Sequence, residues 1–214
     1  INNDCVCMND IIKPLIRFMN QEESAGLLTG KIYGLDGKYT GTHKLFPSLS
    51  KSIFGSKFAR IINKNKFISP KTEINEPTLV EVVSGAFMFF RKDIFDSING
   101  FDKLFFLDCE EEDISKRVWN LGKKVYMIPE PEVTHAHGGS KDDSSDLRNE
   151  YYISYKKLIF KHYGFTYSLL MMIFVYLKIL KLLISRRCDV TLILLAVKGF
   201  PESDSLRYKQ KRID

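Results

Sequence analysis

Strand-like and helix-like segments alternate along residues 79–128, and this alternation constrains the fold more than any other feature of the chain. The predicted elements are strands at 79–83, 86–90 and 125–128 and helices at 92–98 and 110–121. Asn99-Gly100 closes the first helix, Gly122 is placed to cap the second, and Pro129 and Pro131 are expected to stop the last strand. Alternation of this kind is typical of an α/β layer architecture.

The segment before residue 79 adds one more helix and a long connection. Asp10 is a candidate N-cap for a helix through Gln21, with Pro14 in its first turn. A short apolar strand is expected between Gly26 and Gly30, followed by a turn at 35–38. Residues 41–76 are rich in Ser, Lys, Asn and Thr and predict a long surface loop, which in a folded domain is more often functional than decorative.

The composition is that of a folded globular protein. The 214 residues are enough to bury a sizeable core, and 44% of them are hydrophobic. Four cysteines are present without any paired C-x-x-C spacing, so neither a zinc ribbon nor a disulfide framework is indicated. A reducing cytoplasmic setting fits this cysteine usage best.

Positive charge is concentrated in the last third of the chain. Residues 1–147 carry 19 Lys and Arg against 21 Asp and Glu, whereas residues 148–214 carry 13 against 5. The basic residues lie among Leu, Ile, Met and Phe, without a nucleic-acid reader motif, so nucleic acid is not an expected partner. An anionic membrane surface or a lipid-linked diphosphate suits this part of the chain better.

Two helices are predicted in that basic part, at 148–163 and 165–185. The uncharged run 165–177 has 13 residues, fewer than the roughly 20 needed to span a bilayer. We therefore expect the second helix to lie on a membrane surface with its lysines reaching outward. A core helix packed against the α/β domain is the equally weighted alternative.

Three polar motifs could carry chemistry. They are Asn2-Asn3-Asp4, the acids 110–113, and His135-x-His137-Gly-Gly-Ser. Acids at a helix start ordinarily complement the helix dipole, and a lone histidine after a strand is ordinarily structural. Consecutive helical side chains point about 100° apart, so only two of the four acids can face one site, and Glu110 and Glu111 are the better placed pair. A histidine with a carboxylate partner suits a transition metal such as Mn²⁺, and Asp4 could be that partner.

The order of the motifs resembles family 2 glycosyltransferases, most closely the rhamnosyltransferase-like group that makes bacterial surface polysaccharides. The likeness covers most of residues 1–165. It is carried by the segments 82–92 (VVSGAFMFFRK), 100–107 (GFDKLFFL), 110–117 (EEEDISKR), 122–129 and 135–140.

The resemblance implies a role for each motif. Asp4 matches the last acid of an Asp-x-Asp-type motif that holds a divalent cation, Mn²⁺ or Mg²⁺, on the donor diphosphate. His135 matches the histidine that completes this metal site or contacts the diphosphate. Glu111 matches the catalytic base and Glu110 the acid that orients the acceptor, although Asp is commoner than Glu at position 111. The remaining matched positions, implied to bind substrate, are Ser84, Gly85, Ala86, Asp113 and His137.

The resemblance also implies a GT-A fold, which is Rossmann-like, and an inverting, metal-dependent transfer. The donor would be a nucleotide-diphosphate sugar such as dTDP-rhamnose or a UDP-sugar, and the acceptor a polysaccharide or a lipid-linked saccharide. Residues 1–145 would be the C-terminal portion of the catalytic domain, without its nucleotide-binding half, and 146–214 a helical, basic, membrane-associating tail. The expected location is peripheral, on the cytoplasmic face of a bacterial-type membrane. The alternatives are a peripheral membrane-binding module and an inactive glycosyltransferase fragment.

Overall fold

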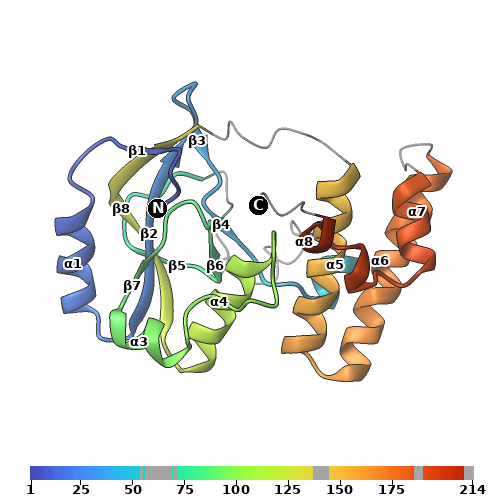
Figure 1. Cartoon of the computed structure of the whole chain (residues 1–214). Coiled ribbons are helices and arrows are strands. Elements are labelled where there is room, and N and C mark those ends of the chain that lie inside the picture. Colours follow the sequence, from blue (N-terminus) through green and yellow to red (C-terminus); the bar gives the residue numbers. More distant parts are fainter. Residues whose placement is uncertain (54, 56–68, 70–71, 137–144, 186–189, 210–214) are drawn as a thin grey trace, which may run out of the picture. The chain divides into compact units, whose positions relative to one another are not determined.

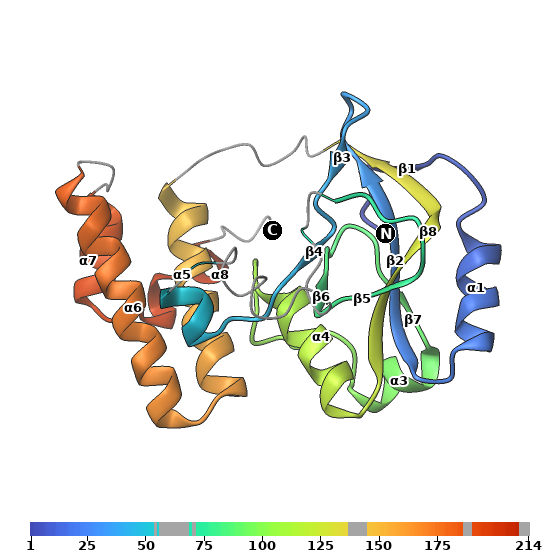
Figure 2. The same ribbon diagram turned by 180° about the vertical axis from the view of Figure 1, so that it is seen from behind.

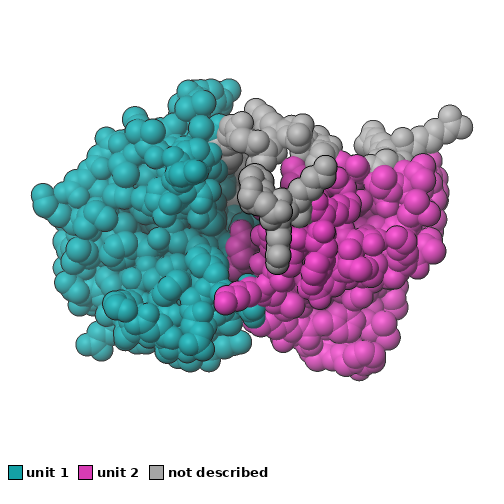
Figure 3. Space-filling model, in the orientation of Figure 1, with its two compact units in different colours: residues 1–46, 54–102, 111–141 teal, residues 47–53, 103–110, 142–214 magenta. Residues whose placement is uncertain are grey.

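The computed structural model describes residues 1–53, 55, 69, 72–136, 145–185 and 190–209 (Figure 1). Two compact units are distinguished in Figure 3. Unit 1 consists of residues 1–46, 54–102 and 111–141, and unit 2 of residues 47–53, 103–110 and 142–214. Unit 1 is α/β and unit 2 is helical, so the α/β class with C-terminal helices expected from the sequence is confirmed.

Unit 1 is built on a six-stranded mixed sheet. Its strands are β1 (Cys5–Cys7), β2 (Ala25–Tyr33), β3 (Tyr39–Thr40), β5 (Thr78–Leu79), β7 (Phe89–Phe90) and β8 (Lys124–His135). The central path runs β1-β8-β2-β3, with β5 beside β8 and β7 beside β2. The long strands β2 and β8 are parallel, whereas the other pairs are antiparallel. A separate two-stranded sheet pairs β4 (His43–Lys44) with β6 (Val82–Val83).

Helices cover both faces of this sheet (Figures 1 and 2). Leu28 and Ile32 of β2 pack with helix α1 (Ile12–Gln21), whereas Leu27 packs with α3 (Lys92–Ser97) and α4 (Glu110–Asn120). Neighbouring residues of a strand point to opposite faces of the sheet. Because helices cover both faces, eight consecutive residues of β2 are buried. A strand covered on both sides needs an apolar run and not an alternating pattern.

The helix ends follow the sequence signals. Asp10 accepts hydrogen bonds from the backbone N–H groups of Ile12 and Lys13, both 3.2 Å long, as expected for a residue that caps α1. Gly122 follows α4 with φ of +76°, a left-handed conformation that favours glycine. Asn99 and Gly100, after α3, also have positive φ.

Strand β8 corrects the expected stop at the prolines, because it continues through both of them to His135. Its register with β2 shifts between Thr29 and Lys31, so the residues around Pro129 and Pro131 form an irregularity that needs no ladder N–H from proline. Gly30 lies opposite. A Cβ there would come within 2.3 Å of the Pro131 carbonyl oxygen, so a residue without a side chain is required.

The strands expected at 79–83 and 86–90 are also corrected. The first is divided between the two sheets, since β5 pairs with β8 and β6 pairs with β4. Only Phe89 and Phe90 of the second are a strand, because the chain turns at 85–86. The expected loop at 41–76 contains β4 and a helical turn at 49–53, and much of the remainder lies outside the described residues.

Unit 2 is a bundle of helices with its own core. It comprises α5 (Ser145–His162), α6 (Phe165–Ile184), α7 (Val190–Val197), a short 3-10 helix (Glu202–Asp204) and α8 (Leu206–Lys209). Its core residues include Ile153, Ile159, Met171, Leu192 and Phe200, all nearly inaccessible to solvent. Helix α5 begins at Ser145, three residues before the expected start. The predicted division of the chain at 145/146 stays a prediction.

Candidate active site

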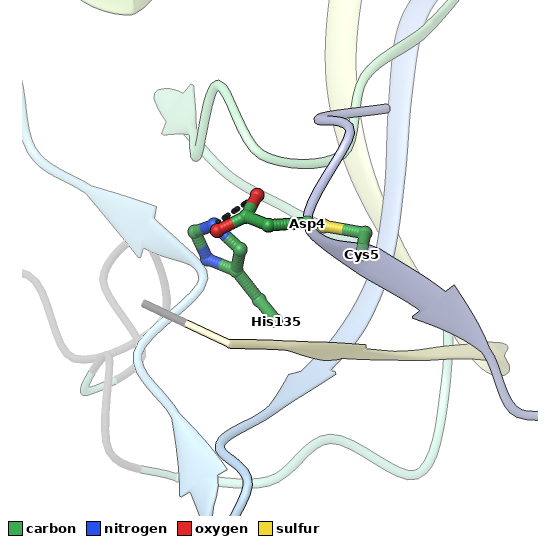
Figure 4. A group of neighbouring side chains, drawn as sticks. All are labelled: Asp4, Cys5 and His135. Carbon is green, nitrogen blue, oxygen red and sulfur yellow. Dashed lines mark ion pairs between the residues drawn. The ribbon is translucent and has the colours of Figure 1, made fainter. Parts of the chain in front are cut away.

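Asp4 and His135 come together where β1 pairs with the end of β8. Cys5 is opposite His135 in this antiparallel ladder, and the Ala136 N–H donates to the Asp4 carbonyl oxygen at 3.1 Å. The His135 Nε2 atom lies 3.1 Å from Asp4 Oδ1. Figure 4 marks this ion pair with a dashed line. The His135 side chain is 12% exposed and that of Asp4 is 35% exposed. Two residues 131 positions apart in the sequence thus form one partly open pair.

Cys5 adds a third potential ligand beside this pair. One ligand atom from each of Asp4, Cys5 and His135 lies within 4.8 Å of the others (Figure 4). Burial, followed by the nearby Asp4 carboxylate, raises the pKa of the Cys5 thiol, so the thiol stays protonated at neutral pH. Its Sγ donates to the Ala86 carbonyl oxygen at 3.6 Å. Sequence reasoning missed Cys5, although its position directly after Asp4 was a usable signal.

The donor set fits a divalent cation that prefers oxygen and imidazole. A carboxylate oxygen and an imidazole nitrogen suit Mn²⁺, and Mg²⁺ would depend more on the carboxylate. A protonated thiol is a weak ligand for either ion. Few protein ligands leave coordination positions for the oxygens of a diphosphate.

The Ser84-Gly85-Ala86 loop lies against the segment that carries Asp4. The Asn2 N–H donates to the Ala86 carbonyl oxygen at 3.0 Å, the same oxygen that accepts from Cys5. The Ser84 N–H donates to the Thr42 carbonyl oxygen at 2.8 Å, which anchors the other side of the loop next to β4. The predicted substrate loop and the predicted metal ligand are therefore neighbours.

Glu111 and Glu112, in the first turn of α4, share the ammonium group of Lys44. Lys44 Nζ is 2.6 Å from Glu111 Oε1 and 3.4 Å from Glu112 Oε1. The two glutamate side chains are 13% and 12% exposed, whereas that of Lys44 is 50% exposed. Lys44 belongs to β4, 67 residues before Glu111. No local pattern in the sequence indicates this contact, and sequence reasoning missed it.

The electrostatics of this group are coupled. Burial, which outweighs the attraction of Lys44, raises the pKa of the Glu112 carboxyl, and the charge of Glu111 adds to the effect. Burial by itself would lower the pKa of Lys44, but the two carboxylates outweigh it and raise that pKa. Lys44 is therefore a permanent cation beside Glu111, and Glu111 is a partly buried, ion-paired carboxylate.

Two of the other predicted site residues on α4 have different positions. Glu110 is the first residue of α4 and is partly buried. The Asp113 side chain is fully buried and pairs with Arg117 at 2.8 Å. Arg117 in turn donates to the carbonyl oxygens of Ile98 and Gly100, each at 2.7 Å. Asp113 thus fixes α4 to the end of α3, and this burial does not support the expected substrate contact. His137 lies outside the described residues.

A chain of contacts links the two halves of the site within unit 1. Lys44 contacts Glu111 and pairs with Val82 across the β4 and β6 ladder. Ser84 follows β6 directly, and the Ser84-Gly85-Ala86 loop contacts the segment around Asp4. Helix α4 is connected directly to β8, so the C-terminus of the helix lies near the beginning of the strand. The N-terminus of α4 is therefore oriented toward the carboxyl end of β8, where His135 lies. Ligands of α/β sheets bind at that edge.

The chain is similar to two curated bacterial enzymes. It is 28% identical over 137 residues to rhamnosyltransferase WbbL of Escherichia coli (strain K12), covering 63% of this chain and 50% of that protein. It is 27% identical over 145 residues to the N-acetylglucosaminyl-diphospho-decaprenol L-rhamnosyltransferase of Mycobacterium tuberculosis, covering 65% of this chain and 47% of that protein. The chain thus spans about half the length of the curated relatives it matches.

The chain was also compared with protein-family models and with solved structures. No protein-family model matches the chain. A solved structure, described as GalNAc-T7 with UDP, GalNAc and Mn²⁺, matches 70% of this chain and 29% of that one, with a TM-score of 0.44 and 14% identity. The resemblance deduced from the order of the motifs is confirmed by the sequence relatives: the chain is similar to bacterial rhamnosyltransferases over roughly two thirds of its length.

Proposed function

We propose that this chain carries the acceptor-side and metal-side residues of an inverting glycosyltransferase with a GT-A fold. The observation that supports the proposal best is that unit 1 gathers three groups in contact through its strands: Asp4 with His135, the Ser84-Gly85-Ala86 loop, and Glu111 with Lys44. The rhamnosyltransferase relatives favour a nucleotide-sugar donor, either dTDP-rhamnose or a UDP-sugar. The relative from M. tuberculosis, by its name, acts on a lipid-linked diphosphate, which favours a lipid-linked or polysaccharide acceptor.

Glu111 has the properties required of the base. In an inverting transfer, the acceptor oxygen bonds to the anomeric carbon while the bond from that carbon to the diphosphate oxygen breaks. The acceptor hydroxyl proton passes to a carboxylate on the acceptor side, the role of Glu111. Lys44 Nζ donates a hydrogen bond to Glu111 Oε1 at 2.6 Å and so holds the carboxylate in place beside the acceptor.

Asp4 and His135 would hold a divalent cation on the donor side. The bound cation supplies charge neutralisation for the departing diphosphate. Asp4 contributes a carboxylate oxygen and His135 contributes Nε2, while the Ser84-Gly85-Ala86 loop forms the adjacent wall. This arrangement separates the group that accepts the proton from the groups that balance the leaving charge.

The test is a Glu111→Gln substitution in the complete enzyme. The amide keeps the shape of the side chain but cannot accept the proton, so transfer should be lost while donor binding stays close to that of the unaltered enzyme. Glu23→Gln removes an equal charge from an exposed position of unit 1 and should leave transfer unchanged. Full transfer by the Glu111→Gln enzyme would refute the assignment of the base.

We further propose a peripheral location on the cytoplasmic face of the membrane. Helix α6, the one helix of the described residues long and apolar enough to cross a bilayer, buries one face in the core of unit 2. A core helix of a soluble protein passes the same test of length and composition. The opposite face of α6 nevertheless exposes eight large apolar or aromatic side chains: Leu169, Leu170, Ile173, Tyr176, Leu177, Leu180, Leu183 and Ile184. An apolar face of this extent favours burial in the interfacial region of a lipid surface.

Vesicle flotation tests the membrane proposal. Ile173→Ser with Leu177→Ser should reduce flotation of the chain with anionic vesicles. Leu35→Ser with Leu121→Ser changes two leucines of unit 1 that are 76% and 48% exposed, at least about as much as the α6 pair, and should not. Equal flotation of both variants would refute a role for α6. Retained flotation without transfer activity in the complete enzyme would favour a membrane-binding module or an inactive fragment.

A further inference from the structure

Unit 2 contains a cavity to which the proposed catalytic site and the proposed membrane contact assign no role. It has a volume of about 400 Å³, within the range of small-molecule sites. The lining residues come from α5, α6 and the helical turn at 49–53: Ser52, Tyr151, Tyr152, Tyr155, Phe174, Val175, Leu177, Lys178 and Lys181. Aromatic and apolar groups thus form most of its wall, and two lysines supply its charge.

The two lysines have no acidic partner among the residues that the structure describes. Other lysines of unit 2 do: Lys157 pairs with Glu202 and Lys198 with Asp204, each at 2.9 Å. Lys178 and Lys181 are three residues apart on α6, a rise of about 4.5 Å, so both can reach the oxygens of one phosphate or diphosphate group. Within the described part of unit 2, the cavity therefore offers an anion two cations that no described acid pairs with.

Aromatic side chains form one wall of the cavity beside the two lysines. Tyr151 and Tyr155, one turn apart on α5, stack with their ring centroids 5.8 Å apart and their planes at 28°. The stacked rings present an apolar surface inside the cavity. Attraction to the headgroups of a flat bilayer would not require such a surface. A concave wall of this kind favours one bound molecule over loose contact with many lipids.

Leu177 connects the cavity to the exposed apolar face of α6. It lines the cavity and is 52% exposed. At 100° per residue, Lys178 and Lys181 lie along one edge of that face, so a ligand with its anionic head between the lysines can extend a tail over the leucines. A soluble nucleotide would leave this apolar path unused.

We propose that the cavity binds the phosphate or diphosphate head of a single polyprenyl lipid, whose chain lies along the exposed face of α6. The proposal rests on the proposed function, because it makes this cavity the holding site for a lipid-linked acceptor. It assigns unit 2 a binding role of its own, apart from the residues that carry the chemistry in unit 1.

The experiment measures binding of the whole 214-residue chain to three kinds of phosphatidylcholine vesicle. One kind contains a polyprenyl diphosphate, the second contains phosphatidylglycerol at the same surface charge, and the third contains the uncharged polyprenol. The expected order is strongest binding to the diphosphate. Equal binding to the first two would mean general attraction to an anionic surface and would overturn the proposal, as would equal binding to diphosphate and polyprenol.

Matched variants then locate the site. Lys178→Gln with Lys181→Gln should weaken binding to the diphosphate vesicles by about tenfold or more, since two cations near the head group are lost. Lys198→Gln with Lys209→Gln removes the same charge from residues that pair with acids and should have little effect. Equal weakening in both variants would overturn the proposal. Lys178→Arg with Lys181→Arg keeps the charge and should bind like the unaltered chain.

The Glu111→Gln variant distinguishes failure of the lipid-site proposal from failure of the catalytic proposal. This variant should retain full binding to the diphosphate vesicles, whereas the same substitution in the complete enzyme should abolish transfer. Loss of transfer without any preference for the diphosphate lipid would leave the catalytic proposal standing and refute the lipid site.

Discussion

Lys44→Met tests the electrostatic coupling at the start of α4. The substitution removes the ammonium group 2.6 Å from Glu111 and 3.4 Å from Glu112 and leaves two adjacent carboxylates, each less than 15% exposed. Exposed ion pairs contribute about 0.2–1 kcal/mol, and removing one partner of a fully buried pair costs about 3–5 kcal/mol. Because Lys44 is half-exposed and serves two carboxylates, we expect a loss of about 2 kcal/mol in the free energy of unfolding at pH 7.

The loss should depend on pH in a definite direction. Burial, followed by the charge of Glu111, holds the pKa of Glu112 above its ordinary value even with Lys44 present, and removing Lys44 raises that pKa further. A carboxyl group whose pKa is higher in the folded state binds more protons when folded, so it destabilises the fold above that pKa and the penalty disappears as pH falls through it. The difference between the variant and the unaltered chain should therefore shrink from pH 7 toward pH 5.

Urea unfolding followed by tryptophan fluorescence reports on this region, because the only tryptophan of the chain, Trp119, belongs to α4. Lys92→Met is the matched control. Lys92 pairs with Asp96 at 2.5 Å, but both side chains are mostly exposed, so the expected loss is about 0.5 kcal/mol or less. Equal losses in the two variants, or a loss at Lys44 that does not change with pH, would refute the coupling.

Three further outcomes are expected. Asp113→Asn leaves Arg117 without its buried partner and should cost about 3 kcal/mol or more in urea unfolding, whereas a cost below about 1 kcal/mol would contradict the structural role of Asp113. Gly30→Ala places a Cβ 2.3 Å from the Pro131 carbonyl oxygen and should lower thermal stability by about 1–3 kcal/mol, and an unchanged melting temperature would mean that β8 is not so close. Asp4→Ala should weaken Mn²⁺ binding by at least about tenfold in calorimetric titration, and undiminished affinity would exclude Asp4 as a ligand.

Local signals along the chain were sufficient for the helices and for the class of the fold. Asp10, Asn99-Gly100 and Gly122 mark helix boundaries because caps depend on the few residues around them. The order of motifs was also enough to indicate similarity to rhamnosyltransferases. Asp4 and His135 were predicted as partners, and the structure places them 3.1 Å apart.

Strand extent and side-chain partners were decided only by the tertiary structure. The prolines were expected to end the last strand, but β2 accommodates them with Gly30 and a shift of register. Asp113 was expected at the substrate, which stays a prediction, and only the structure shows that it is buried and paired with Arg117, which in turn donates to Ile98 and Gly100 beyond α3.

The acids 110–113 show the same division. Their position at a helix start is written in the sequence, because a helix begins where local capping and periodicity allow it. The local sequence does not determine the environments of these acids. Lys44 belongs to a strand 67 residues before Glu111, and its charge acts on the acids through space. Sequence alone therefore indicated candidate residues, among them Asp4, Glu111 and His135, whereas only the folded chain decided which of them are ion-paired, which are buried and which are exposed.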